Sequence, residues 1–169
     1  MTDSNQLPAG TPAEGGANGQ GPTVALQNVY IKDLSFEAPK GPFLPAQAQD
    51  PKIALNLNTV TTSIGPDAHE VVLTVTLEAK NGEIAVYLAE VKQAGIFVVR
   101  GFGPEEMRRI LGAFAPGILF PYVRQTVSDV VTKGGFPPFL LPHVNFDSLF
   151  ERSLQEQAAR QAQASGPAN

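Results

Sequence analysis

The sequence predicts an α+β fold in which a four-stranded antiparallel sheet precedes a set of helices. Apolar residues alternate with a period of two between about residues 25 and 93, which is typical of strands with one buried face. Between about residues 104 and 158 they recur at helical spacing instead. Strands and helices that occupy separate blocks of a chain indicate an α+β fold.

The first predicted strand is "ALQNVYIKDLSFEAP". Val29 and Ile31 share one alternation, and Leu34 and Phe36 share another that is out of phase with the first. The pattern therefore predicts a slip within this strand. Pro39 ends it, because proline has no N–H group to donate to a neighbouring strand.

The second predicted strand, "KIALNLNTVTT", follows a proline-rich connection. Ile53, Leu55 and Leu57 lie on one face, and the residues between them lie on the other, so the period of two is clear. A third strand, "EVVLTVTLEAK", and a fourth, "EIAVYLAEVKQ", complete the predicted sheet.

Asn81-Gly82 joins the third and fourth strands and is the strongest short signal for a β-hairpin. A two-residue turn at these positions fixes which residues face one another. The register predicted in this way pairs Lys80 with Glu83, Leu77 with Val86, Val75 with Leu88, Leu73 with Glu90, and Thr76 with Tyr87.

Three helical segments are predicted after the strands. The first begins at Gly103-Pro104, because proline suits the first helical position, and Pro116-Gly117 is expected to interrupt it. The second ends at Gly134-Gly135, and Asn145 can cap the third. Their apolar stripes are Met107, Ile110, Leu111 and Phe114; Leu119, Val123, Val127, Val130 and Val131; and Phe146, Leu149, Phe150, Leu154 and Ala158.

The two ends of the chain differ in composition from its middle. Residues 1–23 are rich in glycine and proline and nearly free of apolar side chains, so we expect a disordered tail. Residues 157–169 are polar and are expected to form a flexible C-terminal tail. The folded domain is therefore predicted at residues 24–156.

Composition argues for a binding protein rather than an enzyme. A net charge of −4 argues against a nucleic-acid partner, and the absence of cysteine excludes disulfides and thiolate metal sites. With two histidines and no recognisable catalytic motif, the sequence predicts no catalytic residue, metal or cofactor. No apolar run reaches the length of a membrane span, and the N-terminus lacks a secretory signal, so we expect a cytoplasmic protein.

"GGFPPFLLPHVNF" is apolar, but its prolines prevent a regular helix or an inner strand. Both faces of the predicted sheet are also partly apolar, and three helical segments can cover only one of them well. An apolar face without a helical cover predicts a homo-oligomer or a docking surface.

Three longer strings of the chain are distinctive: "NVYIKDLSFEAPKGP", "YLAEVKQAGIFVVRGF" and "LGAFAPGILFPYVRQTVSDVVTKGGFPPFLLPHVNFDSLF". They resemble the SecB family of bacterial protein-export chaperones, and the resemblance covers about residues 24–157. It implies a four-stranded antiparallel sheet with helices on one face, assembled as a homotetrameric dimer of dimers through the long central helix. It also implies an ATP-independent holdase that keeps precursor proteins unfolded in the cytoplasm and delivers them to the translocation ATPase SecA.

The resemblance also implies two binding surfaces. The family's docking residues for the zinc-binding C-terminal tail of SecA fall on Asp33, Glu37, Leu88 and Glu90. The family binds its clients in a long hydrophobic groove, with the last helix as a lid. The candidate residues that line this groove here are Ile53, Leu55, Leu57, Tyr122, Phe136, Phe150 and Leu154.

Other functions stay open at this point. A SecB-like chaperone can serve a toxin–antitoxin system instead of export. An oligomeric adaptor would use the sheet to bind one folded partner, and a small-ligand protein would use the groove as an apolar pocket.

Overall fold

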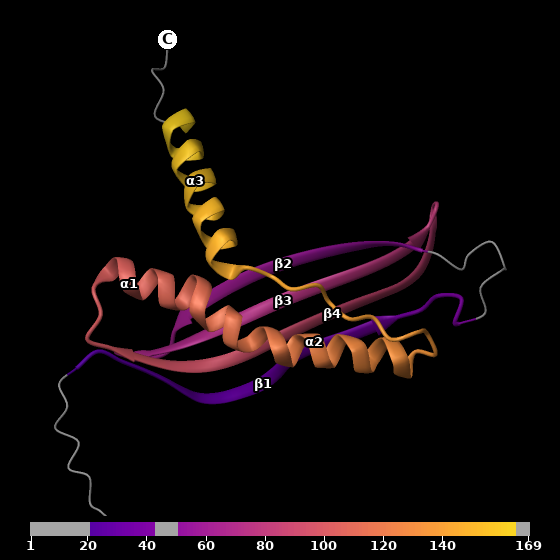
Figure 1. Ribbon diagram of the computed structural model, residues 1–169, viewed down its shortest axis with the longest axis horizontal. Coiled ribbons are helices and arrows are strands. Elements are labelled where there is room, and N and C mark those ends of the chain that lie inside the picture. Colours follow the sequence, from indigo (N-terminus) through magenta and orange to yellow (C-terminus); the bar gives the residue numbers. More distant parts are fainter. Residues whose placement is uncertain (1–20, 43–50, 165–169) are drawn as a thin grey trace, which may run out of the picture.

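The computed structural model describes residues 21–42 and 51–164, and these residues form one layer of strands and one layer of helices (Figure 1). Most of the predicted N-terminal tail, the middle of the proline-rich connection and residues 165–169 lie outside the described residues. The elements are β1 (Thr23–Glu37), β2 (Lys52–Ser63), β3 (Ala68–Asn81), β4 (Ile84–Arg100), α1 (Pro104–Arg109), η2 (Ile110–Phe114), α2 (Ala115–Lys133) and α3 (Phe146–Ala164).

The four strands form one antiparallel sheet in the order β1-β4-β3-β2. The helix α2 lies along one face of this sheet, and α3 projects from the same side (Figure 1). The predicted α+β fold with helices on one face is confirmed. The other face, which we call the outer face, is covered by no helix of the described residues.

The core lies between the sheet and α2. Alternate residues of β3 and β4 point into it, and an amphipathic stripe of α2 meets them. Gly95 on β4 allows close packing, because a Cβ at this position would lie 2.9 Å from Leu119 Cδ2 on α2. The residues of this interface with no exposed surface are Val71, Leu73, Val75, Leu77, Ala89, Val91, Leu119, Val123, Val127 and Val131.

The predicted hairpin register is wrong. The turn residues are Gly82 and Glu83, one place later than predicted, and Gly82 has the left-handed φ of +58° that suits glycine. The register then shifts by one more residue between Ala79 and Lys80, so all pairs of β3 and β4 beyond this point also differ from the prediction. The observed partners are Leu77 with Ala89, Val75 with Val91, Leu73 with Gln93, Thr76 with Glu90 and Lys80 with Ala85.

The predicted slip in the first strand is confirmed. The register of β1 against β4 shifts between Ile31 and Asp33, and again between Leu26 and Asn28. The buried Gln93 side chain stabilises the shift between Ile31 and Asp33, because its Nε2 donates to the carbonyl oxygen of Tyr30 at 2.8 Å. Each shift changes which side chains of β1 reach the outer face.

The predicted helix break at Pro116-Gly117 is wrong. The helix instead continues from α1 through the π-helical segment η2 into α2. The N–H of Ala115 donates to the carbonyl oxygen of Ile110, five residues earlier. This wider turn comes directly before Pro116, whose ring and missing N–H group would disturb an ordinary α-helical turn.

The cap of the last helix is as predicted. Asn145 Oδ1 accepts a hydrogen bond from the N–H of Ser148 at 3.0 Å. The helix then continues to Ala164, beyond the predicted domain boundary at residue 156. The sequence "QAARQAQA" is rich in alanine, glutamine and arginine, which favour helix even without apolar contacts.

Candidate functional site

The four residues that the resemblance assigns to docking lie together on the outer face of the sheet. Leu88 and Glu90 alternate along β4, and Glu37 lies directly opposite Leu88 in the β1–β4 register. Asp33, further along β1, lies opposite Lys92. The neighbours of Leu88 and Glu90 in β4, by contrast, are buried toward the helices. We call Asp33, Glu37, Leu88 and Glu90 the outer acidic surface.

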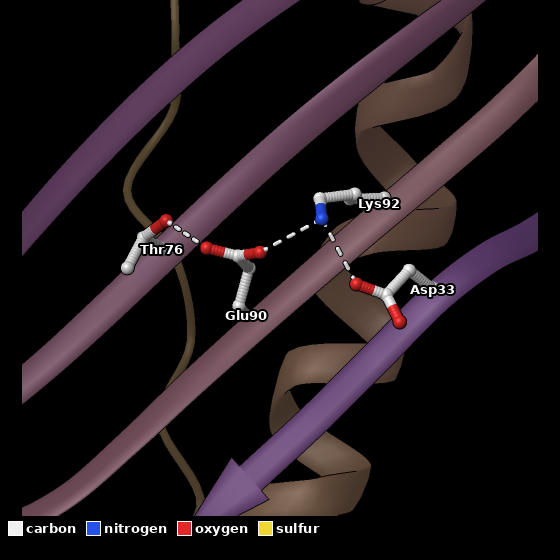
Figure 2. A network of polar contacts seen from close by, with 4 residues as sticks. All are labelled: Asp33, Thr76, Glu90 and Lys92. Carbon is white, nitrogen blue, oxygen red and sulfur yellow. Dashed lines mark hydrogen bonds and ion pairs between the residues drawn. The ribbon is translucent and has the colours of Figure 1, made fainter.

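Lys92 connects two carboxylates of this surface (Figure 2). Its ammonium nitrogen Nζ lies 2.9 Å from Asp33 Oδ2 and 3.2 Å from Glu90 Oε1. The other oxygen of Glu90, Oε2, accepts a hydrogen bond from the Thr76 hydroxyl at 3.2 Å. The contacts thus run in one line across β1, β4 and β3. Sequence reasoning did not include Lys92 or Thr76, although the spacing of Glu90 and Lys92 on one strand places both on one face.

The charges of this line influence one another. The hydrogen bond and the charge of Lys92 hold the pKa of Asp33 below its ordinary value of 3.8. The hydrogen bond from Lys92 to Asp33, and then that to Glu90, raises the pKa of Lys92. Asp33 is therefore ionised and Lys92 is charged near neutral pH. Glu37 makes no ion pair or hydrogen bond with another described residue.

A groove lies on the helix side, between β2, η2 and the start of α3. Its volume is about 470 Å³, and we call it the β2–α3 groove. Leu57 and Phe150, two of the predicted client residues, line it together with the partly exposed Leu149. Gly112 of η2 forms its floor beside Phe150.

Three more predicted client residues lie on the elements that border this groove. Ile53 and Leu55 are on the same face of β2 as Leu57, and Ile53 is 36% exposed. Leu154 lies one turn beyond Phe150 on α3 and is partly buried. These residues could extend an apolar surface along β2 and α3.

The structure does not bring the other two predicted client residues into this groove. Tyr122 is 48% exposed on α2 and does not line it. Phe136 is 7% exposed and belongs to an aromatic cluster in which its ring centroid lies 5.0 Å from that of Tyr87 and 6.3 Å from that of Phe36. Phe136 thus fastens the segment after α2 to the sheet.

The apolar stretch "GGFPPFLLPHVNF" turns back after α2 and runs beside this helix to the start of α3 (Figure 1). Phe136, Leu141 and Phe146 from this stretch are buried in the core, whereas Leu140 is 65% exposed. Leu140 and His143 border a second hollow of about 750 Å³ on the side of α2, together with Ile118 and Arg124. Sequence reasoning missed this hollow, because the path of a proline-rich segment has no periodic signal.

An exposed apolar stripe runs from the end of η2 along α2. Phe114 is 53% exposed, Ile118 36% and Tyr122 48%, and these residues are spaced by four. Such spacing places them on one side of the helix, away from the stripe that meets the sheet. A stripe of this kind is unusual on a surface that stays in water.

Neither a metal site nor a membrane span is found in the described part of the chain. No group of three or more His, Asp or Glu side chains is arranged to hold a metal ion there. None of the described helices combines the length and the apolar character that crossing a membrane requires.

Comparison with known proteins agrees with the resemblance in the sequence. The family model described as "Preprotein translocase subunit SecB" matches residues 17–157. The chain belongs to the SecB family.

Relatives with known names support a role of this SecB chain in export. It is 50% identical over 155 residues to the protein-export protein SecB of Pseudomonas fluorescens SBW25, covering 92% of this chain and 93% of the relative. It is 48% identical over 149 residues to that of Ectopseudomonas mendocina, covering 88% and 92%. The chain is therefore a protein-export chaperone. The SecB family is a family of chaperones and not of enzymes.

A solved structure supports the fold. The SecB-like chaperone of Mycobacterium tuberculosis, in complex with a ChAD peptide from the HigA1 antitoxin, matches with a TM-score of 0.61. The match covers 72% of this chain and 90% of that one, at 19% identity. At this identity the likeness speaks for the fold alone, and the export relatives favour the export function over an antitoxin or adaptor role.

Proposed function

We propose that this SecB chain is an ATP-independent holdase in the cytoplasm that binds unfolded precursor proteins and delivers them to SecA. The observation that carries the proposal is the separation of two surfaces on one sheet. The β2–α3 groove lies on the helix side, and Leu57, Leu149 and Phe150 line it together with polar residues of β2 and α3. The outer acidic surface lies on the opposite face. A client and a partner could therefore bind the same subunit together.

The primary experiment compares an unfolded with a native client. A slow-folding protein in each form is titrated against the chain without ATP, and binding is measured by calorimetry. Holdase activity predicts sub-micromolar binding to the unfolded form only. Binding to the native form alone would favour the adaptor function, and binding to neither would contradict the proposal.

The β2–α3 groove, which Leu57 and Phe150 line, is the proposed client site, and Ile53, Leu55 and Leu154 on the same elements are proposed to extend it. Leu149→Glu tests it, because Leu149 lines the groove and is 38% exposed, so the substitution should leave the fold intact. We expect about tenfold weaker client binding from the loss of one apolar contact worth roughly 1.5 kcal/mol. Leu140→Glu, an equal change at an exposed site outside the groove, should have little effect.

The outer acidic surface is the proposed docking site for the zinc-binding tail of SecA. Its carboxylates lie near the apolar Leu88, which suits a partner segment with both cationic and apolar groups. Glu90→Lys should weaken SecA binding and leave client binding and assembly unchanged. Glu105→Lys, an equal charge reversal on α1, is the control. Equal SecA affinity of the Glu90 variant and the unchanged chain would contradict this assignment.

The exposed stripe of Phe114, Ile118 and Tyr122 supports a homotetramer, a dimer of dimers that is joined through α2. Burial of these side chains against a second copy would remove them from water. Ile118→Asp should halve the molecular mass measured by light scattering at micromolar concentration. A tetramer that persists in this variant and in Tyr122→Asp would place the contact elsewhere.

A further inference from the structure

Lys92 lies at one end of the outer acidic surface, between Asp33 and Glu90 (Figure 2). Its side chain lies on the same face as Glu90, two residues away on β4, and reaches across to Asp33 on β1 (Figure 2). Two of the three carboxylates of the surface are therefore already paired with a cation of the same chain. Glu37 is the carboxylate that has no such pairing with a described residue.

The pairing is exposed and can be exchanged. The Lys92 side chain is 38% exposed, that of Asp33 53% and that of Glu90 32%. Exposed ion pairs contribute little to stability, because water solvates the separated groups almost as well. A cation from another molecule can therefore replace the Lys92 ammonium at small cost.

The carboxylate of Glu90 has a second partner besides Lys92. The Thr76 hydroxyl holds its second oxygen from the neighbouring strand β3. Glu90 thus keeps one fixed hydrogen bond and presents a free oxygen to an incoming cation. A carboxylate held in this way loses less side-chain entropy on binding than a free one.

We propose that Lys92 acts as an internal competitor that sets the affinity of this surface for a cationic partner segment. The inference rests on the proposed docking function of the surface. A partner has to displace Lys92 from Asp33 and Glu90 before it pairs with them. Lys92 thereby favours segments that carry several positive charges over those that carry one, and it keeps the contact weak enough for release.

The test is the affinity of purified SecA for Lys92→Gln, measured by calorimetry over a range of salt concentrations. Removal of the competing cation should tighten binding about three- to tenfold at low salt, the scale expected for exposed charge pairs. The gain should shrink as salt rises, since screening weakens exposed charges. Lys92→Arg keeps the competing charge and should bind like the unchanged chain.

Arg100→Gln is the matched control. Arg100 is also on β4, and its Nε lies 2.8 Å from Asp67 Oδ2, so the substitution removes the same charge and frees a carboxylate. The two positions are eight residues apart, which is roughly 26 Å along a strand. Arg100→Gln should therefore leave SecA affinity within about twofold, because a remote exposed charge is screened.

The variants separate failure of the inference from failure of the docking function. If Glu90→Lys weakens binding but Lys92→Gln does not tighten it, the inference is overturned and the docking surface stands. If Arg100→Gln tightens binding as much as Lys92→Gln, net charge is the cause and the inference is overturned as well. If neither Glu90→Lys nor Lys92→Gln has an effect, the docking function itself fails.

Discussion

The ring of Phe150 on α3 rests directly on the backbone of Gly112 in the π-helical segment η2. A Cβ atom at residue 112 would lie 2.6 Å from Cδ2 and from Cε2 of this ring, closer than real contacts allow. Phe150 therefore needs glycine at this place. Both residues line the β2–α3 groove, so this contact positions α3 beside it.

Gly112→Ala should displace the Phe150 ring and loosen α3. We expect faster hydrogen exchange of the amides of α3, while those of β3 and β4 remain protected. Gly117→Ala is the control in α2, because a Cβ there would meet only Phe146 Cδ2, at an ordinary 3.9 Å. The double variant Phe150→Ala with Gly112→Ala should lose less free energy of unfolding than the two single variants lose together. Additive costs would mean that the two residues are not coupled.

Gly95→Ala should destabilise the packing of α2 on the sheet. The added methyl group would lie 2.9 Å from both Leu119 Cδ2 and Phe97 Cε2, and neither side chain has exposed space to move into. Overpacking of this kind costs about 1–3 kcal/mol in the free energy of unfolding. Urea denaturation measures this free energy. A decrease below about 0.5 kcal/mol would show that α2 can move away from the sheet without strain.

Tyr30 and Lys32 on β1 reach across β4 to the same carboxylate, that of Glu70 on β3. The Tyr30 hydroxyl donates to Glu70 Oε1, and Lys32 Nζ lies 2.6 Å from Oε2. The hydrogen bond to Lys32, then that to Tyr30, holds the pKa of Glu70 below its ordinary value of 4.5. The hydrogen bond to Glu70 in turn raises the pKa of Tyr30. The edge strand is thus tied to a strand that is not its neighbour.

Glu70→Gln should lower stability in a manner that depends on pH. Because the folded pKa is depressed, the contribution of Glu70 is complete above about pH 4.5 and is lost as the pH falls through the folded value. We expect a cost of about 1 kcal/mol at pH 7 that is smaller at pH 3. Urea unfolding at both pH values, at one protein concentration, measures it. A cost that is equal at both values would mean that ionisation of Glu70 does not matter.

The hairpin register can be checked with engineered cysteines, because the chain has none of its own. Thr76 and Glu90 are direct partners across β3 and β4, so Thr76→Cys with Glu90→Cys should form a disulfide on mild oxidation. Thr76→Cys with Tyr87→Cys follows the register predicted from the turn and should keep both thiols free. Titration of free thiols after oxidation distinguishes the two registers.

Local patterns were enough to predict most of the sheet. The alternation in β2 predicted that Leu55 and Leu57 share one face, and the slip predicted after Ile31 is observed as a register shift. The cap at Asn145 was also predictable, because a cap is a contact between residues three apart. Each of these features depends on neighbours in the chain.

Two local signals failed because packing outweighed them. Asn81-Gly82 indicated the hairpin, but the turn moved by one residue and the ladder shifted again, so that Val91 rather than Leu88 faces Val75. Pro116-Gly117 indicated a break, but a π-helical turn let the helix continue across the sheet. In both cases the competing term is the burial of a continuous apolar stripe, which a turn or proline rule does not include.

The sequence by itself determined the α+β architecture, the strands and helices, and the family, because periodicity and motifs are local properties of the chain. Only the tertiary structure decided which side chains meet. It brought Asp33 from β1 and Lys92 from β4 within 2.9 Å, placed Phe150 on Gly112, and moved Phe136 from a predicted groove into the core. These contacts join residues far apart in the chain, and they follow from strand order, register and packing.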